Sequence, residues 1–403
     1  MNAPQRSLSF FQVAAVIEFS GRKVFQTDLF RLLLGSNLFH FLIWYFSITG
    51  GQFEITVVPV IKPATFRVVA VCVTLVTIKF AVLACGRAGP FKTLLYSDLI
   101  TCDHDKTLDL GVSETQIFFY DFQNNFNLSF PIDSAAEGIT TRYNLDVTRK
   151  LVFFVPGYKS HISKNTEDLF RQAFSTLPNI YLIIVDHSAY TSSRGGKIAS
   201  YERSVKFAYY IGQALGKFLA DLHKNGYPSN KIHCIGHSLG SQILGFAGTA
   251  YHDITGEKVW RVTGLDPAGP CFSNSLIDNQ IRSGVGQYVE VYHCNAGGLG
   301  TTAVLADIDF FFNKKGHKQP SCHEGIIPAK GESDAAKCSH KACVRYYTMS
   351  VHLQNGYLAW ACDTYEHYSG GKCAANEVTI AGYNNPGNAT GVFYVSTELY
   401  GIE

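Results

Sequence analysis

The chain has 403 residues, 46% of them apolar, so it can bury the core of one large domain or of two ordinary ones. Charged residues make up only 16% and the formal net charge is +2, which excludes a disordered chain and predicts no nucleic-acid partner. The chain has eleven cysteines, five of them clustered from Cys322 onward, a density typical of an oxidising compartment that predicts a secreted protein.

The amino-terminal region 1–95 differs in texture from the region 96–403, which we expect to form a separate domain. The amino-terminal region contains apolar stretches at 38–48 (LFHFLIWYFSI) and 68–85 (VVAVCVTLVTIKFAVLAC). The second is nearly long enough to span a bilayer and follows Lys62 and Arg67. It lies too far from the chain start for a signal peptide. A signal anchor, a leader preceded by an added exon, and a buried core helix therefore remain as alternatives, and the mature amino terminus stays open.

From about Ser97 onward, apolar runs of strand length alternate with helical periodicity. One helix is expected over 201–225 and another from Leu239 to Ala250. This alternation predicts an α/β fold with a mainly parallel sheet covered by helices on both faces. Strands are expected at 116–121, 150–155, 180–185, 231–236, 259–265 and 288–293.

One short segment, KIHCIGHSLGSQ at 231–242, places a serine between a buried strand and a helix. A glycine two positions before Ser238 and another two positions after it allow neighbouring segments to approach a sharp turn. The amide of Leu239, at the helix amino terminus, would face a developing oxyanion. The competing interpretation is an ordinary glycine-rich turn, but the strand and helix context favours Ser238 as a nucleophile.

A serine nucleophile needs a base, and the base needs an orienting acid. Asp266 ends the next expected strand, and His340 completes the chain order Ser, Asp, His that is typical of the α/β-hydrolase arrangement. Other acids and histidines compete for these two positions, although each has an ordinary structural explanation. The rivals are Asp186, Asp307, Asp309, His293, His317, His323 and His352.

These motifs together resemble the pancreatic lipase family, including its insect members and phospholipases A1, over about Ser97 to Glu403. The carrying segments are GHSLG (236–240), GLDPAGP (264–270), DFFFN (309–313), QPSC (319–322) and CSH (338–340). The resemblance implies an α/β-hydrolase fold, a serine carboxylic-ester hydrolase acting on lipids, and the triad Ser238, Asp266 and His340. It implies no cofactor and no metal; a structural calcium ion stays open.

The resemblance also places a second oxyanion donor, the amide of Tyr158, in the segment Val155-Pro156-Gly157-Tyr158. Pro156 stands where the family has histidine, which leaves the support of this loop in question. A second departure follows His340, where Ala342 replaces the usual arginine.

Several cysteine pairings follow from the same resemblance. Cys322 with Cys338 would close the lid, and Cys362 with Cys373 would close a loop near the carboxyl end. Cys294 and Cys343 stand where the family seldom has cysteine, and we predict that they pair and replace the anchoring of the lost arginine. Cys234 and Cys271 are expected to be buried free thiols.

The predicted lid, His323–Lys337 (HEGIIPAKGESDAAK), is short and polar, and the neighbouring segment 295–306 is short as well. In the family, these features accompany phospholipase A1 or galactolipase activity. One alternative is a neutral triacylglycerol lipase. The other, from a different class, is a non-catalytic lipid-binding or yolk-type storage protein. The expected partner is lipid at a membrane or micelle surface. Only 63 residues follow His340, so no carboxyl-terminal β-sandwich and no colipase are expected, and 391–397 is expected to be a final edge strand. Two sequons, at Asn127 and Asn388, fit a secreted glycoprotein.

Overall fold

The computed structural model describes residues 102–401, apart from 194–195, 273–276, 323–331 and 354, together with four strands nearer the amino terminus. The chain divides into two compact units, Met1–Phe91 and Lys92–Glu403. The apolar stretch 68–85 lies outside the described residues. Within the described part, no helix has the length and apolar character that a membrane crossing requires.

The first unit contains two antiparallel strand pairs. Strand β1 (Ala15–Phe19) pairs with β2 (Arg22–Gln26). Strand β3 (Phe41–Thr49) pairs with β4 (Gln52–Val60), so the apolar stretch 38–48 contributes most of one strand of this hairpin.

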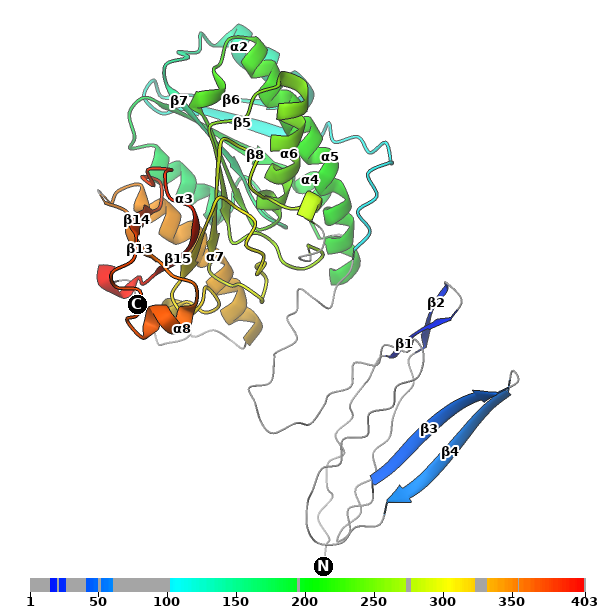
Figure 1. Ribbon diagram of the computed structural model, residues 1–403. Coiled ribbons are helices and arrows are strands. Elements are labelled where there is room, and N and C mark those ends of the chain that lie inside the picture. Colours follow the sequence, from blue (N-terminus) through cyan, green and yellow to red (C-terminus); the bar gives the residue numbers. More distant parts are fainter. Residues whose placement is uncertain are drawn as a thin grey trace, which may run out of the picture. The chain divides into compact units, whose positions relative to one another are not determined.

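The second unit is built on an eleven-stranded sheet in the order β14-β13-β15-β12-β11-β10-β9-β7-β8-β5-β6 (Figure 1). Neighbouring strands from β8 through β7, β9, β10, β11 and β12 to β15 are parallel, and both ends of the sheet carry antiparallel strands. This is the predicted α/β-hydrolase architecture. The strands are β5 (Gln116–Asp121), β6 (Phe126–Pro131), β7 (Lys150–Val155), β8 (Ile180–Asp186), β9 (Ile232–His237), β10 (Arg261–Leu265), β11 (Tyr288–His293), β12 (Ile308–Phe312), β13 (Tyr357–Ala361), β14 (Val378–Ala381) and β15 (Gly391–Val395).

Both faces of the sheet are covered by helices, which explains why the central strands are apolar on both sides. In β7, Leu151, Phe153 and Val155 join the core cluster beneath one helical layer, whereas Val152 and Phe154 join the opposite cluster. Burial of each of these apolar side chains stabilises the fold by about 1.5–3 kcal/mol.

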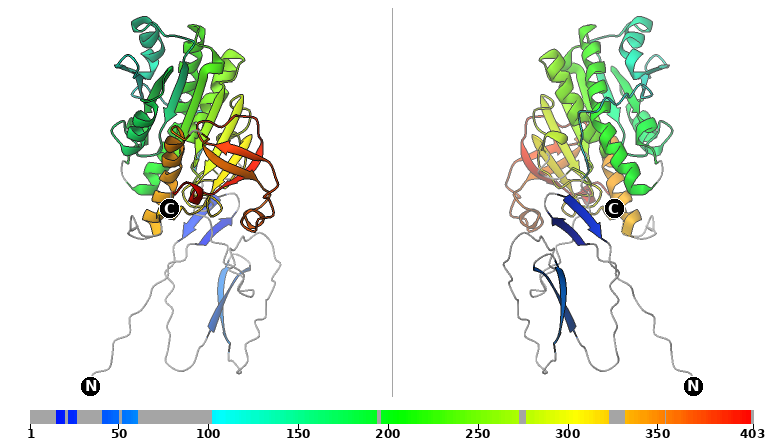
Figure 2. Two further views of the ribbon diagram at one scale, coloured as in Figure 1. Left: turned by 90° about the vertical axis from the view of Figure 1, so that its left-hand side faces the viewer. Right: turned by 90° about the vertical axis from the view of Figure 1, so that its right-hand side faces the viewer.

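One helical layer contains α2, α5 and α6, and the other contains α3 and α7; Figures 1 and 2 show α5 and α6 side by side along the sheet. Helix α6 begins directly after Ser238 and ends where Gly256 adopts a left-handed conformation with φ of 74°. The helices are α2 (Ile132–Arg142), α3 (Asn165–Phe174), α4 (Ser188–Thr191), α5 (Lys197–Lys224), α6 (Leu239–Thr255), α7 (Glu332–Ser350) and α8 (Tyr365–Ser369).

All six predicted strands and both predicted helices are confirmed within a few residues. The prediction of an edge strand at 391–397 is wrong. Strand β15 lies inside the sheet, between β12 and β13, because the hairpin β13–β14 adds outside it. Phe393 and Val395 are accordingly buried.

A buried ion pair fixes the other end of the sheet. The Arg149 guanidinium donates from Nη1 to Asp121 Oδ2 (2.9 Å) and from Nη2 to Oδ1 (3.0 Å). Tyr143 and Asn124 also donate to this carboxylate. Burial by itself would raise the pKa of Asp121, but these hydrogen bonds outweigh it and bring that pKa below the ordinary 3.8.

We expect Asp121→Asn to reduce the loss of stability in acid. Because the pKa of Asp121 is lower in the folded than in the unfolded chain, its contribution is present above the unfolded pKa and is lost as the pH falls through the folded pKa. Between about pH 4 and pH 2, the free energy of unfolding measured with urea should therefore fall more steeply for the wild type than for the variant. Asp253→Asn, at an exposed position, is the control; equal slopes for wild type and Asp121→Asn would contradict this account.

Candidate functional site

Ser238 occupies the turn between β9 and α6, in backbone angles that a serine seldom adopts. Its φ is 56° and its ψ is −121°, and two backbone hydrogen bonds to the next strand and loop hold it there. The Ser238 amide donates to Leu265 O (3.0 Å), and the Ala268 amide donates to Ser238 O (3.1 Å). The residue is largely buried, with 9% of its surface exposed.

The two glycines that flank Ser238 are required by close backbone contacts. A Cβ on Gly236 would lie 2.6 Å from the Cα of Ser241, and one on Gly240 would lie 2.1 Å from Val155 O. A Cβ on Gly157, in the loop after β7, would lie 2.9 Å from Ser238 Cβ. The loop after β7 therefore packs directly against the serine, as the sequence spacing predicts.

Asp266 follows β10 and is completely buried. Its Oδ1 accepts hydrogen bonds from the amides of Cys294 (2.8 Å) and Asn295 (2.9 Å), and its Oδ2 lies 2.5 Å from His340 Nδ1. A Cβ on Gly300 would lie 2.5 Å from Oδ1, so this glycine leaves room for the carboxylate. Backbone amides that stabilise a buried charge also fix its orientation.

His340 lies on α7, two residues after Cys338, and its ring packs beside His237 with centroids 4.7 Å apart. The structure thus brings Asp266 and His340 into direct contact. This contact lies at the carboxyl ends of β9 and β10, the sheet edge at which Ser238 is also found. Among the described residues, the Ser238 hydroxyl makes no hydrogen bond.

His237 contacts His340 from within the serine turn. Its Nε2 donates to the backbone carbonyl of His340 (3.2 Å). Burial, and then the neighbouring His340 and Lys341, lower the pKa of His237 well below 6.5. A neutral His237 places no positive charge beside His340 when that ring becomes protonated.

The two predicted oxyanion donors flank the serine. Leu239 is the first residue of α6, where an amide has no acceptor within the helix. Tyr158 follows the loop Pro156-Gly157 that contacts Ser238.

A histidine from the neighbouring strand end supports the altered Pro156 loop. His187 Nε2 donates to Pro156 O (2.9 Å), and His187 Nδ1 lies 2.7 Å from Thr191 Oγ1. The Lys159 amide donates to Thr191 O (3.0 Å). Burial lowers the pKa of His187 below 6.5, which favours the neutral ring. The loop is therefore held from β8 rather than by a histidine of its own.

Three expected disulfides surround the site and the carboxyl-terminal region. Cys294 is joined to Cys343 (S–S 2.08 Å), Cys322 to Cys338 (2.07 Å) and Cys362 to Cys373 (1.88 Å). The first of these ties the end of β11, whose next amides bind Asp266, to α7 three residues after His340. It therefore ties the segment whose amides bind Asp266 covalently to the helix that carries His340.

The prediction that Cys271 is a free thiol is wrong. Cys271 is bonded to Cys102, from which it is separated by 169 positions. His104 reaches the same loop, with Nε2 2.7 Å from Cys271 O, and its ring packs against Phe272. A contact over this separation leaves no local sequence signal. Cys234 is buried and free as predicted, and burial raises the pKa of its thiol.

The rival acids and histidines have structural contacts of their own. His293 Nε2 pairs with Asp309 Oδ1 (2.8 Å), Asp307 accepts from the Val289 amide, and Asp186 accepts from the amides of Ile162 and Ser188. His317 Nδ1 lies 2.8 Å from Ala296 O. His352 is exposed, and His323 lies outside the described residues.

Gln319 is a contact residue to which the sequence assigned no role. It is fully buried, and its Nε2 donates to Cys294 O (2.8 Å) and Phe312 O (3.1 Å). Its amide donates to Ser339 Oγ (3.2 Å), immediately before His340. Gln319 therefore links Cys294, whose amide binds Asp266, to the helix that carries His340. The sequence signal for this residue was the segment QPSC (319–322). Its spacing alone could not show that the Gln319 side chain is buried.

A possible metal-ligand grouping among the described residues is Cys362, Asp363 and Cys373. Both cysteine sulfurs are bonded to each other, so they are not available as thiolate ligands. This grouping therefore does not fit a metal ion in the oxidised protein.

Comparisons with known proteins bear on the same part of the chain. The sequence model of the family described as Lipase matches residues 85–391. The protein named Lipase member H from Oryctolagus cuniculus is 32% identical over 236 residues, covering 58% of this chain and 49% of that protein. Pancreatic triacylglycerol lipase from Myocastor coypus is 27% identical over 283 residues, covering 66% of this chain and 60% of that protein. The chain spans about half the length of the curated relatives it matches.

Among solved structures, a phospholipase/carboxylesterase from Dyadobacter fermentans is 12% identical, covers 45% of this chain and 73% of that chain, and has a TM-score of 0.28. The strand order and the strand-to-helix turn at Ser238 are those of an α/β-hydrolase fold.

We expect the double variant Cys294→Ala/Cys343→Ala to loosen the contact between Asp266 and His340. Loss of the cross-link should lower the free energy of unfolding by about 2–4 kcal/mol. It should also accelerate solvent exchange of the His340 Nδ1 proton, measured by proton NMR. The matched control is Cys362→Ala/Cys373→Ala, which removes a disulfide in a separate cluster. If both variants leave that exchange rate at the wild-type value, the disulfide does not align the pair.

Proposed function

Because the chain belongs to the lipase family, we propose that it is a serine carboxylic-ester hydrolase that releases fatty acids from lipids, with Ser238, Asp266 and His340 as its catalytic residues. The observation that carries this proposal is the buried contact between Asp266 Oδ2 and His340 Nδ1 (2.5 Å), beside a serine held at φ 56°. A serine nucleophile, a histidine base and a carboxylate that orients the histidine are what acyl transfer requires; here they come from the ends of β9 and β10 and from α7.

In the proposed mechanism, His340 Nδ1 donates to Asp266, so Nε2 is unprotonated and available as a base. It removes the Ser238 proton while Oγ attacks the ester carbonyl, and Asp266 stabilises the resulting imidazolium. The imidazolium then protonates the departing alcohol. Water, activated by the same nitrogen, releases the fatty acid and restores the serine. Catalytic hydrogen bonds to the nucleophile commonly form only when substrate is bound.

The amides of Leu239 and Tyr158 would hold the oxyanion in this reaction. Both are backbone groups, so replacement of the family's phenylalanine by Tyr158 leaves the donor in place. Their positions depend on backbone contacts at Gly157 and Gly240 and on the His187 hydrogen bond to Pro156. Donors that are fixed before the reaction need no reorganisation as charge develops.

For the substrate we propose a phospholipid or galactolipid, cleaved as by phospholipase A1. The lid between Cys322 and Cys338 has 15 residues, and Glu332–Lys337 already form the beginning of α7. A lid this short and polar has little apolar surface for covering a wide acyl groove, which favours substrates with large polar head groups. The likeness to pancreatic triacylglycerol lipase keeps a neutral triacylglycerol lipase as the second candidate.

We further infer that the protein is exported and acts at a lipid surface. Four disulfides among the described cysteines support an oxidising compartment. Asn127 and Asn388 are exposed, as glycosylation would require. Anchoring through the stretch 68–85 is the alternative, and it depends on residues outside the described part.

We expect Ser238→Ala to lower kcat for ester hydrolysis by a factor of about 10³ or more, because it removes the hydroxyl that attacks the ester carbonyl in the proposed mechanism. The variant should also lose covalent labelling by a fluorophosphonate, and its thermal unfolding should stay close to that of the wild type. Ser175→Ala, at the exposed end of α3, is the control. If wild type and Ser238→Ala release fatty acid equally from every lipid, the enzyme assignment fails and the storage-protein alternative gains support.

The substrate class is tested by comparing fatty acid release from three lipids under identical conditions. These are a phosphatidylcholine labelled at its first acyl position, a galactolipid and a triacylglycerol. We expect the highest kcat/KM for one of the two polar lipids. Preference for the triacylglycerol would overturn the phospholipase A1 assignment while leaving the hydrolase assignment intact.

A further inference from the structure

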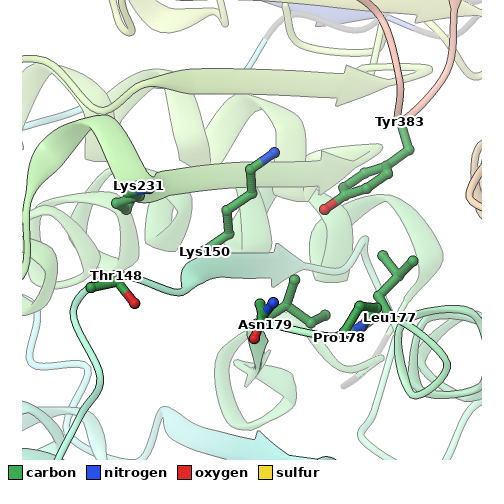
Figure 3. A pocket seen from close by; sticks show the side chains of 8 residues that line it. Thr148, Lys150, Leu177, Pro178, Asn179, Lys231 and Tyr383 are labelled. Carbon is green, nitrogen blue, oxygen red and sulfur yellow. The ribbon is translucent and has the colours of Figure 1, made fainter.

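A cavity of about 310 Å³ opens at the amino ends of β7, β8 and β9 (Figure 3). Thr148, Lys150, Asn179, Lys231 and Tyr383 are among the residues that line it. These three strands are parallel, and Ser238 follows the carboxyl end of β9. The cavity therefore lies at the sheet edge opposite the proposed catalytic site, where an ester substrate is not expected.

Two lysines line the cavity: Lys150 is the first residue of β7, and Lys231 directly precedes β9. Parallel pairing matches Leu151 of β7 with Ile232 of β9, so Lys150 and Lys231 precede matched positions. Neither lysine forms an ion pair with a carboxylate among the described residues. Lys150 Nζ lies 4.8 Å from the centroid of the Trp260 ring, which orients the ammonium without neutralising it.

The nearby buried carboxylate is already occupied. Glu290 accepts from Arg261 (2.6 and 2.7 Å), from Thr263 Oγ1 (2.6 Å) and from Asn385 Nδ2 (2.6 Å). Burial, and then the charges of Arg261 and Lys231, lower the pKa of Lys150. The positive charge at this sheet edge is therefore only partly balanced.

His233, on β9 two residues after Lys231, is buried and is not among the residues that line the cavity. Because Thr263 Oγ1 donates to Glu290, it accepts from His233 Nε2 (2.8 Å). His233 Nδ1 is then a bare acceptor, and it is buried without a hydrogen-bond partner. Burial, and then Arg261 and Lys150, lower the pKa of His233 well below 6.5.

We propose that this cavity binds a phosphate group, with the ammonium groups of Lys150 and Lys231 as its counter-charges. The Tyr383 hydroxyl and the Asn179 side-chain amide line the same cavity and can donate hydrogen bonds to phosphate oxygens. Figure 3 shows the side chain of Lys150 extending toward that of Tyr383. An anion between the lysines would relieve the mutual repulsion of two ammonium groups that line one cavity. The phosphate can belong to a free phosphate compound or to a phospholipid headgroup.

Titration of the intact protein with inorganic phosphate, at constant ionic strength, tests the site. We expect saturable binding by calorimetry and a rise in the unfolding temperature of about 2 °C or more at saturation. The double variant Lys150→Met/Lys231→Met should weaken binding by about tenfold or more, since it removes both charged donors. Its unfolding temperature without phosphate should equal or exceed that of the wild type, because the repulsion is gone.

The matched control is Lys217→Met/Lys224→Met, which removes two lysines that pair with Asp221 on α5. This variant changes the net charge equally and should retain phosphate binding. Equal weakening in both double variants would show a general charge effect and would overturn the proposal.

A second arm distinguishes the sources of the phosphate. Vesicles of phosphatidylcholine, with and without phosphatidic acid, are sedimented with each protein. Retention that requires both phosphatidic acid and the two lysines supports the site and assigns the phosphate to a lipid headgroup; binding of inorganic phosphate alone assigns it to a soluble compound. If neither probe distinguishes Lys150→Met/Lys231→Met from the wild type, the cavity is not a phosphate site.

Discussion

The buried carboxylate of Asp266 is the interaction on which the site depends. A fully buried charge is costly unless hydrogen bonds replace the lost water. Here two consecutive amides, those of Cys294 and Asn295, donate to one oxygen and His340 contacts the other. The position of β11 and the loop after it therefore determines the orientation of the acid, and the acid determines the orientation of the histidine.

Around this carboxylate, two departures from the family pattern are answered by contacts from elsewhere in the fold. The missing arginine after His340 coincides with a disulfide that ties α7 to β11. The missing histidine at Pro156 coincides with a hydrogen bond from His187, at the end of the adjacent strand. In both cases a contact from another strand end fixes the backbone segment concerned. Backbone placement, rather than the identity of the supporting side chain, is what these positions have in common.

Sequence reasoning was most accurate where the information is local. Apolar runs gave the central strands, and the glycines around Ser238 correctly indicated a crowded turn, because each depends on residues within a few positions. It failed where distant segments meet: Cys271 pairs with Cys102, and β15 is covered by a hairpin that precedes it in the chain. The contacts of Gln319 and His187 were missed for the same reason, since a side chain's partners across the sheet leave no trace in its neighbours.

Gly300 shows why the presence of the three proposed catalytic side chains is an incomplete measure of activity in chains of this kind. A single methyl group at this position would lie 2.5 Å from one carboxylate oxygen of Asp266 and 2.6 Å from the other. A relative that had gained an alanine there would still display serine, aspartate and histidine in the expected order. It would nevertheless have to displace its acid or its loop. Inventories that separate active enzymes from inactive descendants by triad residues alone would misclassify such a chain.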